Sequence, residues 1–551
     1  MDRTADRALP DLTITEVAPL LARRELSPVE LTRAVLERIE RLNPFLNAYI
    51  TVAADRAMRD ARASEQEIVR GEYRGPLHGV PIGHKDVIEA AGMRTTGHSR
   101  ALPDYVPVQD ATVVERLARS GTVLLGKLTT YELACGATPI YGLPINPWHP
   151  GYITGGSSAG SAAGVSAGLC FGATGTCTAG SIRVPSSFCG VVGLKPTYGL
   201  VSRAGVLHLS WSLDHVGPHA RSVRDAAILL SAMAGHDPRD PATSKLPVPD
   251  YAAAIPDPSA AASAPLRGLR LGVPRGFFDP PVQPDVIARV SEAYRALEEL
   301  GAELVPVDLS TAAITSAALR AVMGAEGLVA HLERLRQRSG DYAPHTRRTV
   351  LIGAALSASE YLRGQRLRER VKREFAQVLT TVHALVWPST MRTAFAVDEP
   401  QAWSGQQTRL SNLTGTPSLS VPAGFDGRGL PVGLQINGRP FDEALLFRIG
   451  AAFEDATTHH DARPVVQLVE PARPGKQFAD VPRPVDVGEA ELDGVRDDVR
   501  RGLRLHGLQL DPADLDPLAF ELYALRRDLD EAERSAPAGV NFEPAVLQVA
   551  R

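Results

Sequence analysis

The chain has 551 residues, of which 44% are hydrophobic and 22% are charged, a composition typical of a soluble globular protein. That length can bury one very large core or two to three ordinary ones. The formal net charge of -4 gives no reason to expect nucleic acid or an anionic membrane as a partner. The polar start, MDRTADRALPDLT, does not have the pattern of a signal peptide.

The cysteines number four, at Cys135, Cys170, Cys177 and Cys189. Their spacing fits no zinc pattern, and a secreted chain of this size with so few is not expected to depend on disulfides. We therefore expect no metal and a reducing, cytoplasmic compartment.

The N-terminal part, residues 12–70, has mostly helical patterning. The run Ser27-Pro28-Val29-Glu30 predicts a capping box with proline at the first helical position. Residues 47–52 have the pattern of a short strand, and residues 61–72 that of a charged helix face.

A second strand is predicted at residues 80–82, just before Lys85-Asp86. Taken alone, this dipeptide favours a solvated or salt-bridged lysine paired with Asp86. A helix at 111–120 and a strand at 122–125 follow. The stretch 121–128 nearly matches a P-loop, but Leu128 stands where a Ser or Thr must hold Mg²⁺, so we reject that interpretation.

The stretch 155–189 reads GGSSAGSAAGVSAGLCFGATGTCTAGSIRVPSSFC, and its first charged residue is Arg183. A transmembrane helix is disfavoured because the run is rich in Gly, Ser and Thr and lacks apolar bulk. A flexible linker would not carry apolar residues such as Leu169 and Phe171. An anion-binding loop at 155–160 stays open, although no Gly-Lys-Ser/Thr follows it. We interpret the stretch as the floor of an active site.

Alternating strand and helix signals recur at 269–309, with strands at 269–273 and 303–305, the second closed by Pro306, and a helix at 285–300. Residues 255–267 have the composition of a surface loop, and residues 310–400 are mostly helical. A hairpin with its turn at 426–429 is predicted within 412–438.

The C-terminal part changes character after a Pro-rich linker at 471–486. Two amphipathic helices are predicted there, one with Leu492, Val495, Val499 and Leu503, and one with Leu518, Leu522, Leu525 and Leu529. Two such helices cannot build a core of their own, so we expect them to lie against the main body or a neighbour rather than to be solvated.

Lysine is rare, with only six residues, so a lysine in an apolar setting suggests a role that arginine cannot fill, namely losing its proton. Serines offer two candidate nucleophiles. The run 156–160 matches the G-x-S-x-G elbow of α/β-hydrolases, which would make Ser158 the nucleophile, but that elbow needs a strand before it and NPWHPGYITGG is not a convincing one.

The other candidate comes from a resemblance. The segments GVPIGHKD (79–86), GGSSAGSAAGVSAG (155–168) and GTCTAGSIRVPSSFCGVVGLKPTYG (175–199) resemble the amidase signature family, and the resemblance extends over about residues 12–470. It implies an α/β/α sandwich with a mixed central sheet. It also implies a catalytic triad of Lys85, Ser157 in a cis peptide bond, and Ser181 as nucleophile, with no metal or organic cofactor.

The resemblance implies an oxyanion hole made by the backbone N–H groups of Thr178, Ala179, Gly180 and Ser181. The family pattern GTD-x-GGS is broken here at two places: Cys177 replaces an aspartate, and Ala179 replaces a glycine and would be strained at a positive φ. We expect Cys177 to be a packed, inert thiol. Without the aspartate to compete for it, Arg183 is, as a hypothesis, freer to contact a substrate oxygen. Cys177 and Arg183 are therefore candidate substrate-binding residues.

These observations predict an amidase domain at 1–470, the linker at 471–486 and a helical extension at 487–551 that is weakly similar to small helical companion subunits of some family complexes. The expected activity is hydrolysis of a small-molecule carboxamide, carbamate or urea C–N bond, by a homodimer on the family's precedent. Two alternatives remain: the glutaminase/amidotransferase subunit that supplies ammonia for tRNA-dependent amidation, and a catalytically impaired, binding-only relative.

Overall fold

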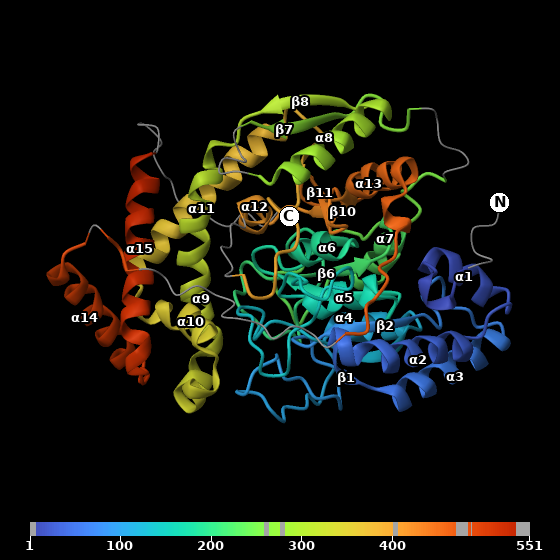
Figure 1. The fold of residues 1–551 in the computed structure, drawn as a ribbon, viewed down its shortest axis with the longest axis horizontal. Helices are drawn as coiled ribbons and strands as arrows, with labels where there is room; N and C mark the ends of the chain where they lie inside the picture. The colour runs from blue at the N-terminus through green and yellow to red at the C-terminus, as the bar shows by residue number, and fades with distance from the viewer. Residues whose placement is uncertain are drawn as a thin grey trace.

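The computed structural model describes residues 7–257, 264–275, 282–399, 406–469, 483–485 and 487–535. In these residues a sheet of 11 strands runs through the main body, and helices surround it (Figure 1). In sheet order the strands are β1 (Tyr49–Val52), β3 (Val123–Leu128), β2 (Pro81–Lys85), β4 (Gly172–Cys177), β6 (His215–Ala220), β5 (Val192–Lys195), β10 (Ser418–Phe425), β11 (Pro431–Asn437), β9 (Ala384–Pro388), β7 (Arg270–Pro274) and β8 (Glu303–Val307).

The sheet is mixed, as predicted. Strand β2 is parallel to both β3 and β4, and β7 is parallel to both β8 and β9, whereas β5, β6, β10 and β11 pair antiparallel with their neighbours. Parallel neighbours end at the same edge of a sheet. The last residues of β2 and β4, Lys85 and Cys177, therefore lie at one edge.

The helices are α1 (Ile14–Ala22), α2 (Pro28–Leu46), α3 (Ala54–Val69), α4 (Thr112–Arg119), α5 (Ala159–Ser166), α6 (Arg183–Cys189), α7 (Val223–Met233), α8 (Pro284–Glu299), α9 (Thr315–Arg338), α10 (Pro344–Ala355), α11 (Ala358–Val378), α12 (Gln406–Thr414), α13 (Glu443–Thr457), α14 (Glu489–Leu505) and α15 (Leu515–Arg534).

Both faces of the sheet are covered by helices, which the alternation along β10 demonstrates. Ser418 contacts Arg183 of α6, and the next residue, Leu419, packs against Gly450 of α13. Successive side chains of a strand point to opposite faces. Helices α6 and α13 therefore lie on opposite faces, and the α/β/α sandwich is confirmed.

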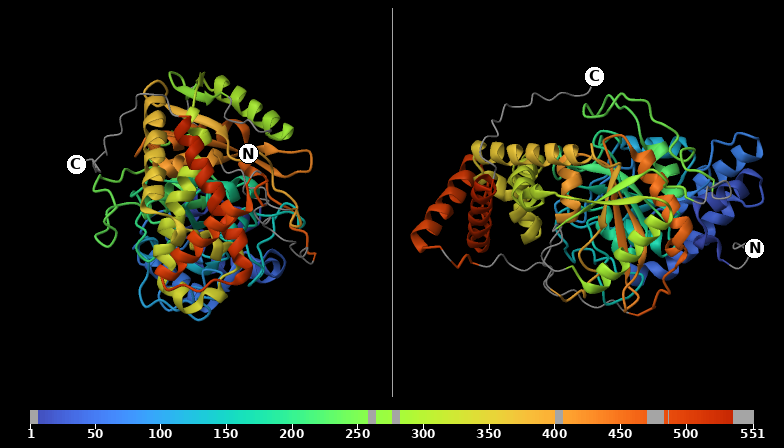
Figure 2. Two further views of the ribbon diagram at one scale, coloured as in Figure 1. Left: turned by 90° about the vertical axis from the view of Figure 1, so that its left-hand side faces the viewer. Right: turned by 90° about the horizontal axis from the view of Figure 1, so that it is seen from above.

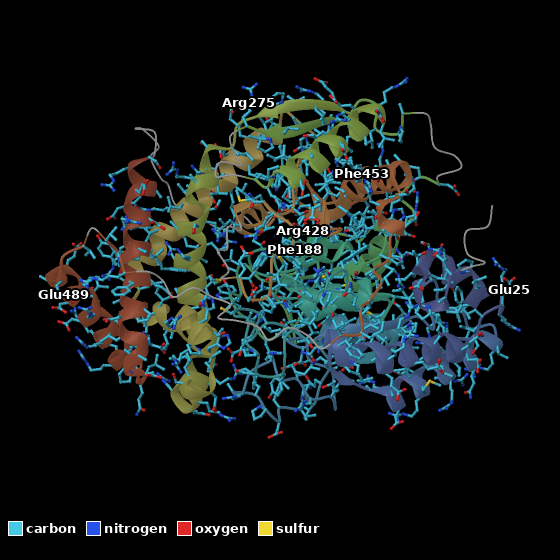
Figure 3. The ribbon with its side chains drawn as sticks, viewed as in Figure 1. Glu25, Phe188, Arg275, Arg428, Phe453 and Glu489 are labelled. Carbon is cyan, nitrogen blue, oxygen red and sulfur yellow. The ribbon has the colours of Figure 1, made fainter. Side chains whose placement is uncertain are left out.

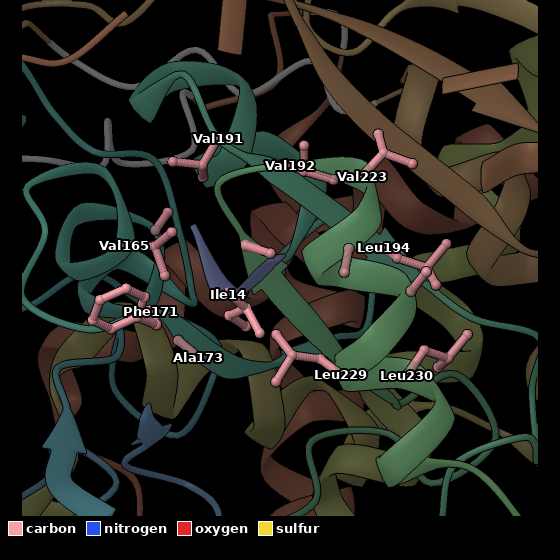
Figure 4. Packing of buried hydrophobic residues seen from close by; sticks show 14 of the residues in the cluster. Ile14, Val165, Phe171, Ala173, Val191, Val192, Leu194, Val223, Leu229 and Leu230 are labelled. Carbon is pink, nitrogen blue, oxygen red and sulfur yellow. The ribbon is translucent and has the colours of Figure 1, made fainter. Parts of the chain in front are cut away.

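The small-residue run forms a fully buried helix and strand rather than a membrane span. All eight residues of α5 are buried, and so are all six residues of β4, the next element along the chain. A β-carbon at Gly160 would lie 2.3 Å from the carbonyl oxygen of Ala48, so only glycine allows this approach. Phe171, Ala173 and Leu229 of α7 all belong to the main hydrophobic cluster (Figure 4).

Helix α2 begins as the sequence predicted, but its capping box does not form as expected. Ser27 accepts hydrogen bonds from the amides of Val29 and Glu30, while its hydroxyl donates to Glu65. Reciprocal capping boxes form instead at the starts of α1 and α11. Ser27 therefore predicted the start of α2 correctly, but its hydroxyl binds the Glu65 carboxylate of α3 rather than forming a capping box with Glu30.

Most other boundaries agree with the sequence to within a few residues. The hairpin of β10 and β11 encloses the predicted turn at 426–429, although residues 412–414 of the predicted range belong to α12. Strand β8 continues through Pro306 to Val307, so the prediction that Pro306 closes it is wrong. Because β8 is the edge strand, the missing N–H of proline is tolerated there. Residues 258–263 of the predicted 255–267 loop lie outside the described residues.

The two C-terminal helices dock on the main body, as predicted. Helix α15 packs on α9, α10 and α11, and α14 packs on α10 and α15 (Figure 2). Arg347 of α10 donates to Asp514 at 2.5 Å with both side chains almost fully buried. At Gly502 of α14, a β-carbon would lie 2.0 Å from the carbonyl oxygen of Ala354. Glu489, at the start of α14, lies at the opposite end of the molecule from Glu25 (Figure 3). The predicted linker falls mostly on residues 471–482 and 486, which lie outside the described residues.

One helical segment in the described part of the chain, Ser310–Asp341, is long and apolar enough to cross a membrane. It contains α9, and 67% of its most apolar window is buried inside the protein. Helix α9 packs there against α10, α11 and α15, which is also the environment of a core helix.

Candidate active site

Lys85, the last residue of β2, is fully buried at the sheet edge. Its Nζ donates to Ser157 Oγ at 2.8 Å and to Thr176 Oγ1 at 2.8 Å. Burial lowers the pKa of this amine from 10.5 to about 7, although the nearby negative charges of Cys177 and Asp214 act to raise that pKa. A substantial fraction of Lys85 is therefore neutral near neutral pH and able to accept a proton.

The sequence prediction that Lys85 pairs with Asp86 is wrong. Asp86 is also fully buried, but its carboxylate lies 3.1 Å from Lys127 Nζ and accepts from Thr96. Lys85 ends β2 and Asp86 lies in the turn that follows, where Asp86 meets Lys127 of β3 instead.

Ser157 lies in the loop before α5, and the Gly156–Ser157 peptide bond is cis, as the resemblance implied. The Ser157 carbonyl oxygen accepts from the Tyr131 amide at 3.0 Å and from Thr130 Oγ1 at 3.1 Å. These contacts hold the backbone so that the Ser157 hydroxyl meets the Lys85 amine.

Ser181 lies in the loop between β4 and α6 and is partly exposed, unlike Lys85 and Ser157. Its carbonyl oxygen accepts from the Ser158 amide at 3.2 Å, which ties this loop to the residue directly after Ser157. The structure thus brings all three predicted residues into one region, and Ser181 is the partly exposed residue among them.

Ser158, the alternative nucleophile, is fully buried. Its Oγ donates to the Thr176 carbonyl oxygen at 3.1 Å and accepts from the Thr176 amide at 3.2 Å. Residues 154–158 form a loop, so the strand that a nucleophile elbow requires does not precede Ser158. This geometry disfavours the hydrolase-elbow interpretation.

The sequence profile of the family described as Amidase matches residues 30–447 of this chain. The chain belongs to the amidase signature family.

Its relatives in this family match over almost their whole length. A glutamyl-tRNA(Gln) amidotransferase subunit of Thermosynechococcus vestitus is 40% identical over 485 residues, which is 82% of this chain and 99% of the relative. A putative amidase, AmiD, of Mycobacterium bovis is 40% identical over 474 residues, 84% of this chain and 98% of the relative. The solved peptide amidase of Stenotrophomonas maltophilia superposes with a TM-score of 0.71 at 31% identity, covering 84% of this chain and 98% of that one.

The place where this chain departs from the amidase signature pattern forms a buried polar cluster. Arg183 and Cys177 are both fully buried, and Arg183 Nη2 contacts Cys177 Sγ at 3.5 Å, the Thr408 carbonyl oxygen at 3.0 Å and Asn412 Oδ1 at 2.5 Å. In this structure α12 supplies partners for Arg183, and its contact with a substrate stays a prediction. Cys177 is packed, as expected. Burial raises the pKa of its thiol, but the charge and hydrogen bond of Arg183 contribute most to bringing that pKa below its usual value.

The other departure, Ala179, does not adopt a positive φ, whereas Gly180 has a φ of 145°. A β-carbon at Gly180 would lie 2.3 Å from Thr408 Oγ1. The glycine that the loop requires is thus Gly180, and alanine is accommodated at the position before it.

Three contacts of this loop come from residues that sequence reasoning did not single out. Thr176 holds the Lys85 amine, Asp214 accepts from Thr178 Oγ1 at 2.5 Å, and Thr408 Oγ1 donates to the Ala179 carbonyl oxygen at 2.6 Å. Thr176 lies inside the segment 175–199 that resembles the amidase signature family, so the sequence held a signal for it. Thr408 is far away in sequence and shows no local pattern.

Proposed function

We propose that this amidase signature enzyme hydrolyses a small-molecule carboxamide, or a carbamate or urea C–N bond, through a seryl acyl-enzyme. The observation that carries the proposal is the buried Lys85 amine, 2.8 Å from Ser157 Oγ and with a pKa of about 7. Such an amine can serve as a general base near neutral pH.

In the proposed mechanism Ser181 Oγ attacks the carbonyl carbon while its proton passes to Ser157 Oγ, and the Ser157 proton passes to Lys85 Nζ. A neutral Lys85 amine accepts from the Ser157 hydroxyl, reversing the direction of the present hydrogen bond. The same path then returns the proton to the leaving nitrogen as the C–N bond breaks. Water attacks the acyl carbon next, releases the acid and restores the Ser181 hydroxyl.

The proposed oxyanion hole is the backbone of Thr178, Ala179, Gly180 and Ser181. Within the described part of the chain, the N–H groups of these four residues donate to no backbone carbonyl. Their loop is held by Asp214 and Thr408. Preorganised, unused donors of this kind stabilise a tetrahedral intermediate, and losing one typically costs about 10²–10³ in rate.

A second candidate function keeps this chemistry and changes the substrate. Relatives about 40% identical are named as glutamyl-tRNA(Gln) amidotransferase subunits, so glutamine is a candidate amide donor and other subunits are candidate partners. The docked helices α14 and α15 favour the stand-alone amidase, because they resemble a companion subunit already joined to the chain. A glutaminase assay without partner proteins separates the two functions.

The compartment and the assembly state are part of the same proposal. The four cysteines are free in the structure, which agrees with a reducing cytoplasm. The homodimer is proposed on the family's precedent. The division into a domain at 1–470, a linker at 471–486 and an extension at 487–551 is proposed on the sequence. Light scattering of the full chain tests the dimer.

The test of the proposal is turnover across a panel of aliphatic amides, aryl amides, carbamates and ureas, with Lys85→Ala and Ser181→Ala as controls. A fluorophosphonate should label wild-type Ser181. Labelling of Ser158 would favour the hydrolase elbow. The absence of both labelling and turnover would favour the binding-only relative.

A further inference from the structure

Arg183 is a fully buried cation whose neighbours are nearly all neutral. Beyond Cys177, its guanidinium donates to five oxygens: Ser411 Oγ, Ser418 Oγ at 3.2 Å, Gln435 Oε1 at 3.5 Å, the Thr408 carbonyl oxygen at 3.0 Å and Asn412 Oδ1 at 2.5 Å. Among the described residues, no carboxylate pairs with it. Buried charges in proteins are normally paired, since an isolated one is costly to desolvate.

Cys177 supplies the one ionisable group in this contact shell. Its sulfur accepts from Arg183 Nη2 at 3.5 Å. Another polar contact of the sulfur is Asn412 Oδ1, 3.6 Å away, which also accepts from Arg183 at 2.5 Å. Arg183 is thus the one charged group in hydrogen-bond contact with the sulfur among the described residues.

The orientation of Asn412 is fixed by its amide nitrogen. Nδ2 donates to the Cys177 carbonyl oxygen at 2.8 Å and to the Leu213 carbonyl oxygen at 3.3 Å. Its Oδ1 must therefore face Arg183 and the sulfur, and a flipped side chain would put an N–H₂ group against the guanidinium.

Charged and titratable groups from four other elements surround Cys177. They are Arg183 of α6, Lys195 of β5, Lys85 of β2 and His215 of β6. Burial raises the pKa of the Cys177 thiol, but the Arg183 charge and hydrogen bond, the Ile182 amide and Lys195 together hold that pKa below its usual value. Burial raises the pKa of Cys135 and Cys170 to about 12 each, so Cys177 differs from them in direction.

We propose that Cys177 is a buried thiolate, ion-paired with Arg183, and that this pair joins the end of β4 to the start of α6 and so positions the Ser181 loop between them. The family pattern has an aspartate at this place, so the thiolate supplies the negative charge that the carboxylate would carry. Cys177 is thus a positioning residue: its partner Arg183 begins α6, two positions after the proposed nucleophile Ser181. The ion pair stands on contacts alone, and only the positioning role depends on the proposed function.

The ion pair is tested by the ultraviolet absorbance of thiolates in the folded, full-length enzyme at neutral pH. The difference spectrum of wild type minus Cys177→Ser should show a thiolate band, and that of wild type minus Cys135→Ser should show none. Should Cys177→Ser fail to fold, acid titration of the wild-type band, followed with circular dichroism, gives the same answer. A thiolate band that is absent from the folded wild type at neutral pH overturns the proposal.

The positioning role is tested by kinetics with Cys177→Asp and Cys177→Ser. Cys177→Asp keeps the charge and should retain kcat better than Cys177→Ser, which should lose on the order of tenfold in kcat with KM little changed. Because Lys85 would also lose a nearby negative charge, the pH profile of Cys177→Ser should move to lower pH. Equal kcat values for the Asp and Ser variants overturn the positioning role. A thiolate band in an enzyme without turnover would overturn the proposed function and leave the ion pair standing.

Discussion

Replacing Lys85 by Met is the perturbation that tests the buried base most directly. The pKa of Lys85 is lowered from 10.5 to about 7, and each unit corresponds to about 1.4 kcal/mol, so the folded state disfavours the ammonium by about 5 kcal/mol. Met has a similar length and no charge, so it removes this cost together with the base. We expect Lys85→Met to lose activity without losing the fold.

The sign of the pH dependence follows from proton binding. Between pH about 7 and pH 10.5 the unfolded chain holds the Lys85 proton and the folded chain does not, so wild-type stability rises with pH. From about pH 7.5 to about pH 9.5 the Lys85 contribution to the free energy of unfolding should grow by about 3 kcal/mol. Lys85→Met lacks this contribution, and the difference between the two slopes isolates Lys85 from other titrating groups.

Two measurements test the neutral amine. Denaturant unfolding of both proteins at the two pH values gives the slopes. The profile of wild-type kcat/KM against pH should fall about tenfold per unit below pH about 7, as Lys85 becomes protonated. Equal stability slopes in the two proteins, or a kcat/KM profile that stays flat through pH 7, would refute a neutral buried amine.

Three other substitutions test further contacts of the fold and the site. Ser157→Ala should lower kcat by about 10²–10⁴ with little change in KM, because it interrupts the proton path and not substrate contact; steady-state kinetics decides this. Ser158→Ala should lose about 1–3 kcal/mol of stability, since it leaves the Thr176 amide and carbonyl without their partner, yet Ser181 should still be labelled by a fluorophosphonate; loss of the label would contradict this. Gly502→Ala should lower the thermal unfolding midpoint, because its β-carbon would lie 2.0 Å from a backbone oxygen; an unchanged midpoint would show that α14 does not need its present position.

The amidase signature family, the residues that meet at the candidate site and most element boundaries could be predicted from the sequence. The signals there are local: strand patterns, Ser27 at a helix start, and the runs around Lys85, Ser157 and Ser181. Such patterns depend on residues that are neighbours along the chain, so one sequence suffices to find them.

Pairings between distant residues were decided only by the tertiary structure. Asp86 meets Lys127 rather than Lys85, and Arg183 meets α12, more than 220 positions away. Contacts of this kind depend on which face of a strand each residue occupies and on which helix covers that face. The sequence therefore identified the residues that meet at the candidate site, while burial in the folded sheet lowers the pKa of Lys85, because desolvation exists only once the surrounding elements have packed.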